Sequence, residues 1–152
     1  MVYPPLQDFL PHRPPMLLID ELVHCDEHQV TVTVTVRAGT PFVSDGRVPA
    51  MISLEYFAQS VAALYAYLHR AQPGQGEGKL LGTRELELAV DYFHVGDHLT
   101  ITGHETWRDE HLAQFRCELH RAGVRLAAAS ISVSHGGEPP QPPHQPPSAE
   151  NP

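Results

Sequence analysis

The chain has 152 residues, 41% of them hydrophobic, which is enough to form one domain with a buried core. Its formal net charge is −8, with only 10 Lys and Arg residues and no basic run, which argues against nucleic acid or an anionic membrane as a partner. The opening stretch, MVYPPLQDFL, has neither a basic region nor an apolar run long enough for a signal peptide or a membrane span, so we expect a cytoplasmic protein.

The first half of the chain predicts two strands and a helix. Residues 16–25 form an apolar run of strand length. The stretch 28–36 alternates strictly, with valine at 30, 32, 34 and 36 and threonine at 31, 33 and 35, a pattern typical of a half-buried strand. After a loop, the stretch 49–70 predicts one long helix with Pro49 in its first turn.

The second half predicts more strands and then an unstructured end. A glycine-rich connection at 71–78 is expected to be flexible. Four strand-like segments separated by turn signals follow, at 79–93, 97–109, 110–122 and 125–135. Residues 136–152 contain seven of the 15 prolines and no large apolar residue, so we predict a disordered tail behind a domain spanning 1–135. One long helix followed by an antiparallel meander predicts the α+β class.

The predicted helix is apolar around most of its circumference, which is typical of a buried helix rather than one lying on a surface. Because the sequence offers only one such helix, the sheet must wrap around it. A long central helix wrapped by a curved antiparallel sheet of about five to six strands is the hotdog fold.

Glu55 interrupts this apolar helix. At about 100° per residue it shares a face with Ala58, Gln59 and Ala62. A buried carboxylate is costly unless it is paired or takes part in chemistry, and burial favours the protonated form that a general acid needs. Gln59, one turn later, can hold its orientation, and the small alanines leave room for a ligand.

Glu55 and the histidines can also be interpreted without any catalytic role. Glu55 is equally compatible with a solvated position at the helix edge, or with an ion pair to Arg47 or Arg84. The 11 histidines raise the question of a metal, but none has the spacing of a metal-binding motif, and His94 and His98 flank a Gly-Asp turn. We therefore expect no metal and no cofactor.

Three stretches carry motifs in a set order: LPHRPPMLLIDEL at 10–22, VPAMISLEYFAQS at 48–60 and DYFHVGDHLTITGH at 91–104. Together they resemble the bacterial 3-hydroxyacyl-acyl-carrier-protein dehydratases of the hotdog superfamily. In that family the catalytic acid follows a helix-leading Pro by six residues, with Gln four residues later. The likeness covers about residues 9–135. Within the family, the Val-Pro-Ala start and the Glu-Tyr-x-Ala-Gln run are most similar to divergent dehydratase-like proteins found with aryl-polyene pigment pathways.

This resemblance implies dehydration of a 3-hydroxyacyl thioester, carried on acyl carrier protein or coenzyme A, to a trans-2-enoyl thioester in fatty-acid or polyene-type biosynthesis. Glu55 would be the acid and Gln59 its orienting residue. The backbone N–H groups of Ala50 and Met51 would polarise the thioester oxygen. The acyl tunnel would be lined by Phe42, Ala58 and Ala62.

The sequence departs from the family at one place. The family has a catalytic histidine in a Gly-His-Phe-Pro-Gly loop ahead of the helix, where this chain has Pro41, and no histidine lies within 29–68. In the family, this histidine faces the acid of the other subunit across a dimer interface. We therefore favour a heterodimer in which a related hotdog subunit supplies the histidine. In a homodimer the candidates for the base are His12, His69 and His94.

Two other functions stay open at this point. A hotdog thioesterase would use Glu55 to activate water and would release free acid. A scaffold subunit would stabilise a catalytic partner without using Glu55 at all.

Overall fold

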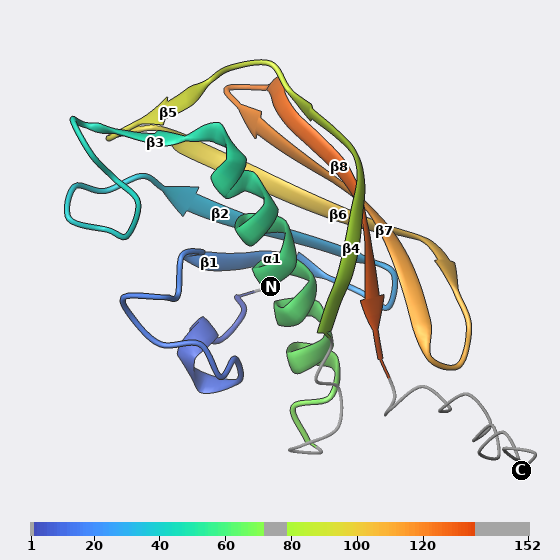
Figure 1. Cartoon of the computed structure of the whole chain (residues 1–152). Coiled ribbons are helices and arrows are strands. Elements are labelled where there is room, and N and C mark those ends of the chain that lie inside the picture. The colour runs from blue at the N-terminus through green and yellow to red at the C-terminus, as the bar shows by residue number, and fades with distance from the viewer. Residues whose placement is uncertain (1, 72–78, 136–152) are drawn as a thin grey trace, which may run out of the picture.

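A computed structural model describes residues 2–71 and 79–135 of the chain (Figure 1). The tail predicted at 136–152, and all but the first residue of the connection predicted at 71–78, lie outside these described residues. The helical elements are the 3₁₀ turns η1 (Leu6–Asp8) and η2 (Ala50–Ile52) and the helix α1 (Ser53–Leu68). The strands are β1 (Glu21–Cys25), β2 (Gln29–Thr35), β3 (Arg47–Pro49), β4 (Lys79–Leu88), β5 (Tyr92–His94), β6 (His98–Arg108), β7 (Leu112–Arg121) and β8 (Val124–Ser134).

Six of these strands form one antiparallel sheet in the order β1-β2-β6-β7-β8-β4, and β3 pairs with β5 in a small second sheet. The helix α1 lies across one face of the large sheet and contacts β1, β2, β6, β7 and β8 (Figure 1). The α+β prediction and the hotdog fold are confirmed.

The core lies between α1 and the sheet. The valines of β2 alternate as the sequence pattern predicts, with Val30 and Val32 buried beneath the helix and the threonines between them only partly covered. From the helix side, Phe57, Val61 and Leu64 are buried against these strands. The apolar side of α1 and the face of the sheet that it covers are removed from water together. Burial of the helix therefore depends on the sheet curving around it.

Several predicted boundaries are wrong for identifiable reasons. The run at 16–25 forms a strand only from Glu21, because the N–H groups of Met16 and Leu17 bond to the Arg13 carbonyl in a turn. The segment at 79–93 divides into β4 and β5. Pro49 ends β3, and the α-helix begins at Ser53 after a 3₁₀ turn.

The strand β4 is an edge of the large sheet and carries exposed apolar side chains. Its partner β8 covers one side only, so the other row of backbone groups has no strand beside it within the described residues. Leu81, near the start of β4, is 55% exposed. An uncovered edge of this length is normally blunted or paired with another chain.

No helix in the described ranges is both long and apolar enough to cross a membrane.

Candidate active site

Gln59 ties the helix to the segment that precedes β1. Its side chain is 1% exposed and uses three hydrogen bonds. The amide nitrogen donates to the Met16 carbonyl at 2.8 Å and to Glu55 Oε1 at 3.0 Å, while the amide oxygen accepts the Leu18 N–H at 2.9 Å. A buried amide with this many partners has one orientation, so Glu55 is held at a set position on the helix surface.

Glu55 has a neutral partner rather than a cation. It is half-buried, and it takes part in none of the ion pairs found within the described residues. Arg47, one of the partners considered from sequence, instead stacks over the Tyr92 ring at 3.9 Å. The carboxyl group is thus oriented without being neutralised.

A cavity of about 170 Å³ lies beside this carboxyl group. From α1, the residues on one stripe at helical spacing line it: Glu55, Ala58, Gln59, Val61, Ala62 and Tyr65. The rest of the wall comes from His12, from Leu80 on β4 and from Val133 on β8. The predicted pair Ala58 and Ala62 therefore stands at the cavity, where short side chains leave the space open.

Two other predicted residues are placed elsewhere. Phe42 does not line the cavity, because it lies in the loop before β3 with φ of 69° and is 59% exposed. The N–H of Ala50 is not free to polarise a thioester, since it donates to the Asp91 carbonyl at 2.8 Å. We correct both expectations. Met51 is an exposed residue in the 3₁₀ turn and stays the backbone candidate.

The three histidines considered as bases are separated by the fold. His12 lines the cavity. His69 caps the far end of α1, and His94 pairs with Arg47 on the small sheet; neither belongs to the cavity wall.

Tyr65 is a cavity residue that sequence reasoning missed. It is buried, and its hydroxyl oxygen has no hydrogen-bond partner in the part of the chain that the structure describes. Burial, with a smaller contribution from Glu105, raises the pKa of Tyr65 to about 12, so the hydroxyl stays neutral and able to donate. Its position three residues after Ala62 continues the helical stripe of Glu55, a signal that was available in the sequence. By contrast, Leu80 and Val133 reach the cavity only through sheet pairing.

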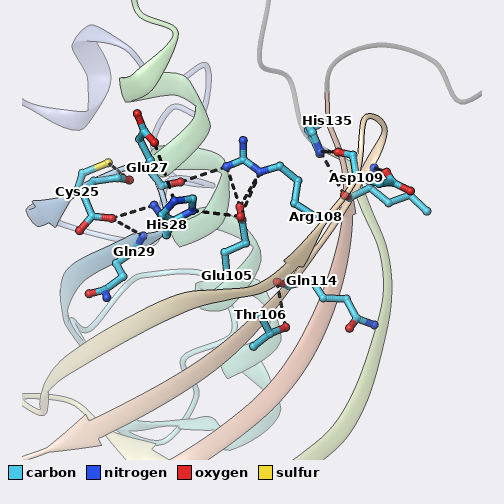
Figure 2. A network of polar contacts seen from close by, with 12 residues as sticks. Cys25, Glu27, His28, Gln29, Glu105, Thr106, Arg108, Asp109, Gln114 and His135 are labelled. Atoms are coloured by element: carbon cyan, nitrogen blue, oxygen red, sulfur yellow. Dashed lines mark hydrogen bonds and ion pairs between the residues drawn. The ribbon is translucent and has the colours of Figure 1, made fainter.

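A second polar cluster lies at one end of the sheet (Figure 2). Glu105 on β6 accepts hydrogen bonds from Arg108, the shortest at 2.9 Å, and its Oε1 lies 3.2 Å from His28 Nδ1. The hydrogen bonds to Glu105 raise the pKa of Arg108 above its usual value. Arg108 also donates to the Glu27 carbonyl at 3.2 Å. These groups satisfy one another, which is typical of a structural network.

Comparison with known proteins gives the family. A model of the ApeP-like family, described as ApeP dehydratase, matches residues 4–142. The chain belongs to this family. It is a dehydratase-type protein of the hotdog fold, and dehydratases are lyases.

Solved structures agree with this assignment. The dehydratase heterocomplex ApeI:P from Xenorhabdus doucetiae aligns with a TM-score of 0.81 and 26% identity, over 90% of this chain and 93% of that chain. A homologue of HP0420 from Helicobacter felis has a TM-score of 0.68 at 12% identity, covering 89% of this chain and 92% of its own. A hypothetical thioesterase from Streptococcus pneumoniae, solved with coenzyme A, has a TM-score of 0.59 at 15% identity, covering 75% and 83%. The last two show the fold alone. The search of curated proteins finds no match.

Proposed function

We propose that this protein dehydrates 3-hydroxyacyl thioesters to trans-2-enoyl thioesters, with Glu55 as the general acid. The observation that supports this most directly is the position of Glu55, held by the buried Gln59 amide beside a cavity in a dehydratase-family fold, with no cation paired to it among the described residues. A carboxyl group oriented in this way beside a cavity is placed to give a proton to a bound substrate.

The reaction requires two proton movements. A base removes the proton from C2, and the electrons of that bond form the C2–C3 double bond as the C3–O bond breaks. The Glu55 carboxyl group gives its proton to the departing hydroxyl, which leaves as water. The proton on the base then returns to Glu55 through solvent, so the protein is unchanged after one turnover. In this proposal Met51 N–H is the backbone donor to the thioester oxygen, which gains negative charge as C2 loses its proton.

We further propose that a second, related hotdog subunit closes the cavity. The wall includes Leu80 on β4, and β4 is one of the two edge strands of the large sheet. A partner strand along β4 would pair its free backbone groups, cover the exposed Leu81 and add a further wall beside Leu80. The similarity to the ApeI:P heterocomplex supports a partner with a different sequence.

The thioester would be carried on acyl carrier protein, in fatty-acid or polyene-type biosynthesis in the cytoplasm. Two free cysteines, Cys25 and Cys117, fit a reducing compartment. Acyl carrier proteins are acidic, so the docking site would use basic residues of this chain. The candidates are Arg13, Arg37, Arg47, Lys79 and Arg84.

The test is a dehydration assay followed by mass spectrometry. The substrate is 3-hydroxyacyl carrier protein, incubated with the chain alone and with a related hotdog subunit encoded nearby, each with wild-type and Glu55→Gln protein. We expect enoyl product that is lost with Glu55→Gln. Product formed only by the mixture would support the heterodimer.

Two results would overturn the proposal. Release of free acid and carrier thiol, without enoyl product, would indicate a thioesterase. Dehydration by the mixture that is insensitive to Glu55→Gln would make this chain a scaffold subunit.

A further inference from the structure

The family places its catalytic histidine in the loop before the helix, and that place is Pro41 in this chain. The fold nevertheless brings a histidine to Glu55 from another direction. His12, in the segment between η1 and β1, lines the same cavity as Glu55, and it is the one histidine in the wall among the described residues. The second titratable group that a dehydration site needs is therefore present within the same chain.

His12 lies on a segment held on both sides. Before it, Leu10 is buried in the core. After it, the Arg13 guanidinium donates to the carbonyls of Leu10 at 2.6 Å and His12 at 2.9 Å. Beyond Arg13, Gln59 bonds the Met16 carbonyl and so fixes the segment to the same amide that holds Glu55. Glu55 and His12 are thus positioned relative to each other through Gln59.

One nitrogen of the His12 imidazole is unpaired. Nδ1 is buried and has no hydrogen-bond partner among residues 2–71 and 79–135. Leaving a buried polar atom unpaired costs about 1–3 kcal/mol, so this nitrogen calls for a partner, and a reacting group in the cavity is one that it can serve. The other titratable groups in the cavity wall are Glu55 and Tyr65, both on α1, and Arg13 is the adjacent cation.

We propose that His12 is the base of this site, accepting the C2 proton while Glu55 protonates the leaving hydroxyl. This inference rests on the proposed dehydration. The C2–H bond breaks, its electrons form the C2–C3 double bond, and the imidazole becomes an imidazolium that loses its proton to solvent. The partner subunit then contributes cavity wall, and the histidine that the sequence led us to expect from it is not required.

The test compares His12→Asn with His104→Asn in the complex with its partner subunit, using the same carrier-bound substrate. His104 is an exposed histidine on the outer side of β6, away from the cavity, and serves as the matched control. We expect His12→Asn to lower kcat by at least about 100-fold, the usual contribution of a general base, with KM changed by no more than a few-fold. His104→Asn should leave both unchanged.

The pH profile separates a base from a group that only positions the substrate. In the wild-type protein kcat should fall on the acid side as the imidazole gains a proton, and that limb should be absent in the residual activity of His12→Asn. Thermal unfolding of each variant shows whether the segment still folds, and His12→Gln repeats the test with a longer amide.

The outcomes also distinguish this inference from the proposed function. Full activity of His12→Asn in a complex that Glu55→Gln inactivates would overturn the role of His12 and return the base to the partner subunit. A raised KM with unchanged kcat, or an unchanged acid limb, would overturn it too. Activity that neither His12→Asn nor Glu55→Gln reduces would contradict the proposed function, because neither residue would then take part in dehydration.

Discussion

The fold partly or largely buries two glutamates, Glu105 and Glu55, and gives them different partners. Glu105 has a side chain that is only 7% exposed, and it is surrounded by the Arg108 guanidinium and the His28 ring (Figure 2). Glu55, on the helix, faces a cavity, and its one side-chain partner among the described residues is the neutral Gln59 amide.

This difference in partners suits Glu105 to a structural role and Glu55 to a chemical one. The Glu105 carboxylate is held by charge-assisted hydrogen bonds from Arg108, so it serves as a structural anchor. The Glu55 carboxyl group is oriented by a neutral amide and faces a cavity, so it is accessible to a substrate. Substitutions at the two sites should separate the structural role from the chemical one.

Glu55→Gln should abolish most activity while leaving the fold intact. The amide keeps the shape of the side chain but cannot give a proton, so we expect kcat to fall by about 10²–10⁴-fold in the dehydration assay. Thermal unfolding should change little, because the amide can still bond to Gln59. A large loss of stability accompanying the loss of activity would instead assign Glu55 a structural role like that of Glu105.

Gln59→Leu should destabilise the protein strongly and also reduce activity. It leaves the Met16 carbonyl and the Leu18 N–H without their partner, and each unpaired buried group costs about 1–3 kcal/mol. We expect a loss of about 3 kcal/mol in chemical denaturation, with a lower kcat in the molecules that fold. A loss below about 1 kcal/mol would contradict the role of Gln59 as the link between helix and N-terminal segment.

Glu105→Gln should reduce stability and spare activity. Because Arg108 is 39% exposed and can turn to water, we expect a loss of about 1–2 kcal/mol rather than the full cost of a buried unpaired charge. Glu87→Gln, in an exposed ion pair with Arg125, is the matched control and should change stability by less than about 1 kcal/mol. A large fall in kcat for Glu105→Gln would contradict the division between the two sites.

Tyr65→Phe should leave stability unchanged or slightly raised, within about 1 kcal/mol. The hydroxyl is buried without a partner among the described residues, so its removal loses no hydrogen bond to them. Thermal unfolding with and without a substrate analogue measures this. A destabilisation of about 2 kcal/mol without ligand would show that the hydroxyl is bonded to an internal water.

The smallest effect concerns the thiols. Burial raises the pKa of Cys25 to about 11 and that of Cys117 to about 12, so both are neutral thiols at pH 8 and should react slowly with iodoacetamide until the protein unfolds. Because these values exceed the unfolded value of 9.0, their contribution to stability is complete below pH 9 and is lost as the pH rises towards 11–12. Rapid labelling of Cys25 in the folded protein at pH 8 would contradict this.

Much of the fold and part of the site could be predicted from local patterns. The valine alternation at 28–36 and the single apolar helix were sufficient for the hotdog arrangement, because side-chain periodicity reflects which face is buried. The approach of Gln59 to Glu55 followed from helical spacing. The placing of Phe42 and of the Ala50 N–H was wrong, since both depend on a loop and a small sheet that no periodic pattern describes.

The sequence by itself determined the helix, the place of the carboxyl group on it and the absence of the family histidine from its loop, because each depends on neighbours along the chain. Only the tertiary structure decided what surrounds Glu55. The cavity joins His12, Leu80 and Val133 from three distant segments, and the sheet order and the Gln59 hydrogen bonds bring them together. Contacts between residues so far apart arise from the packing of whole elements, which spacing in one segment does not encode.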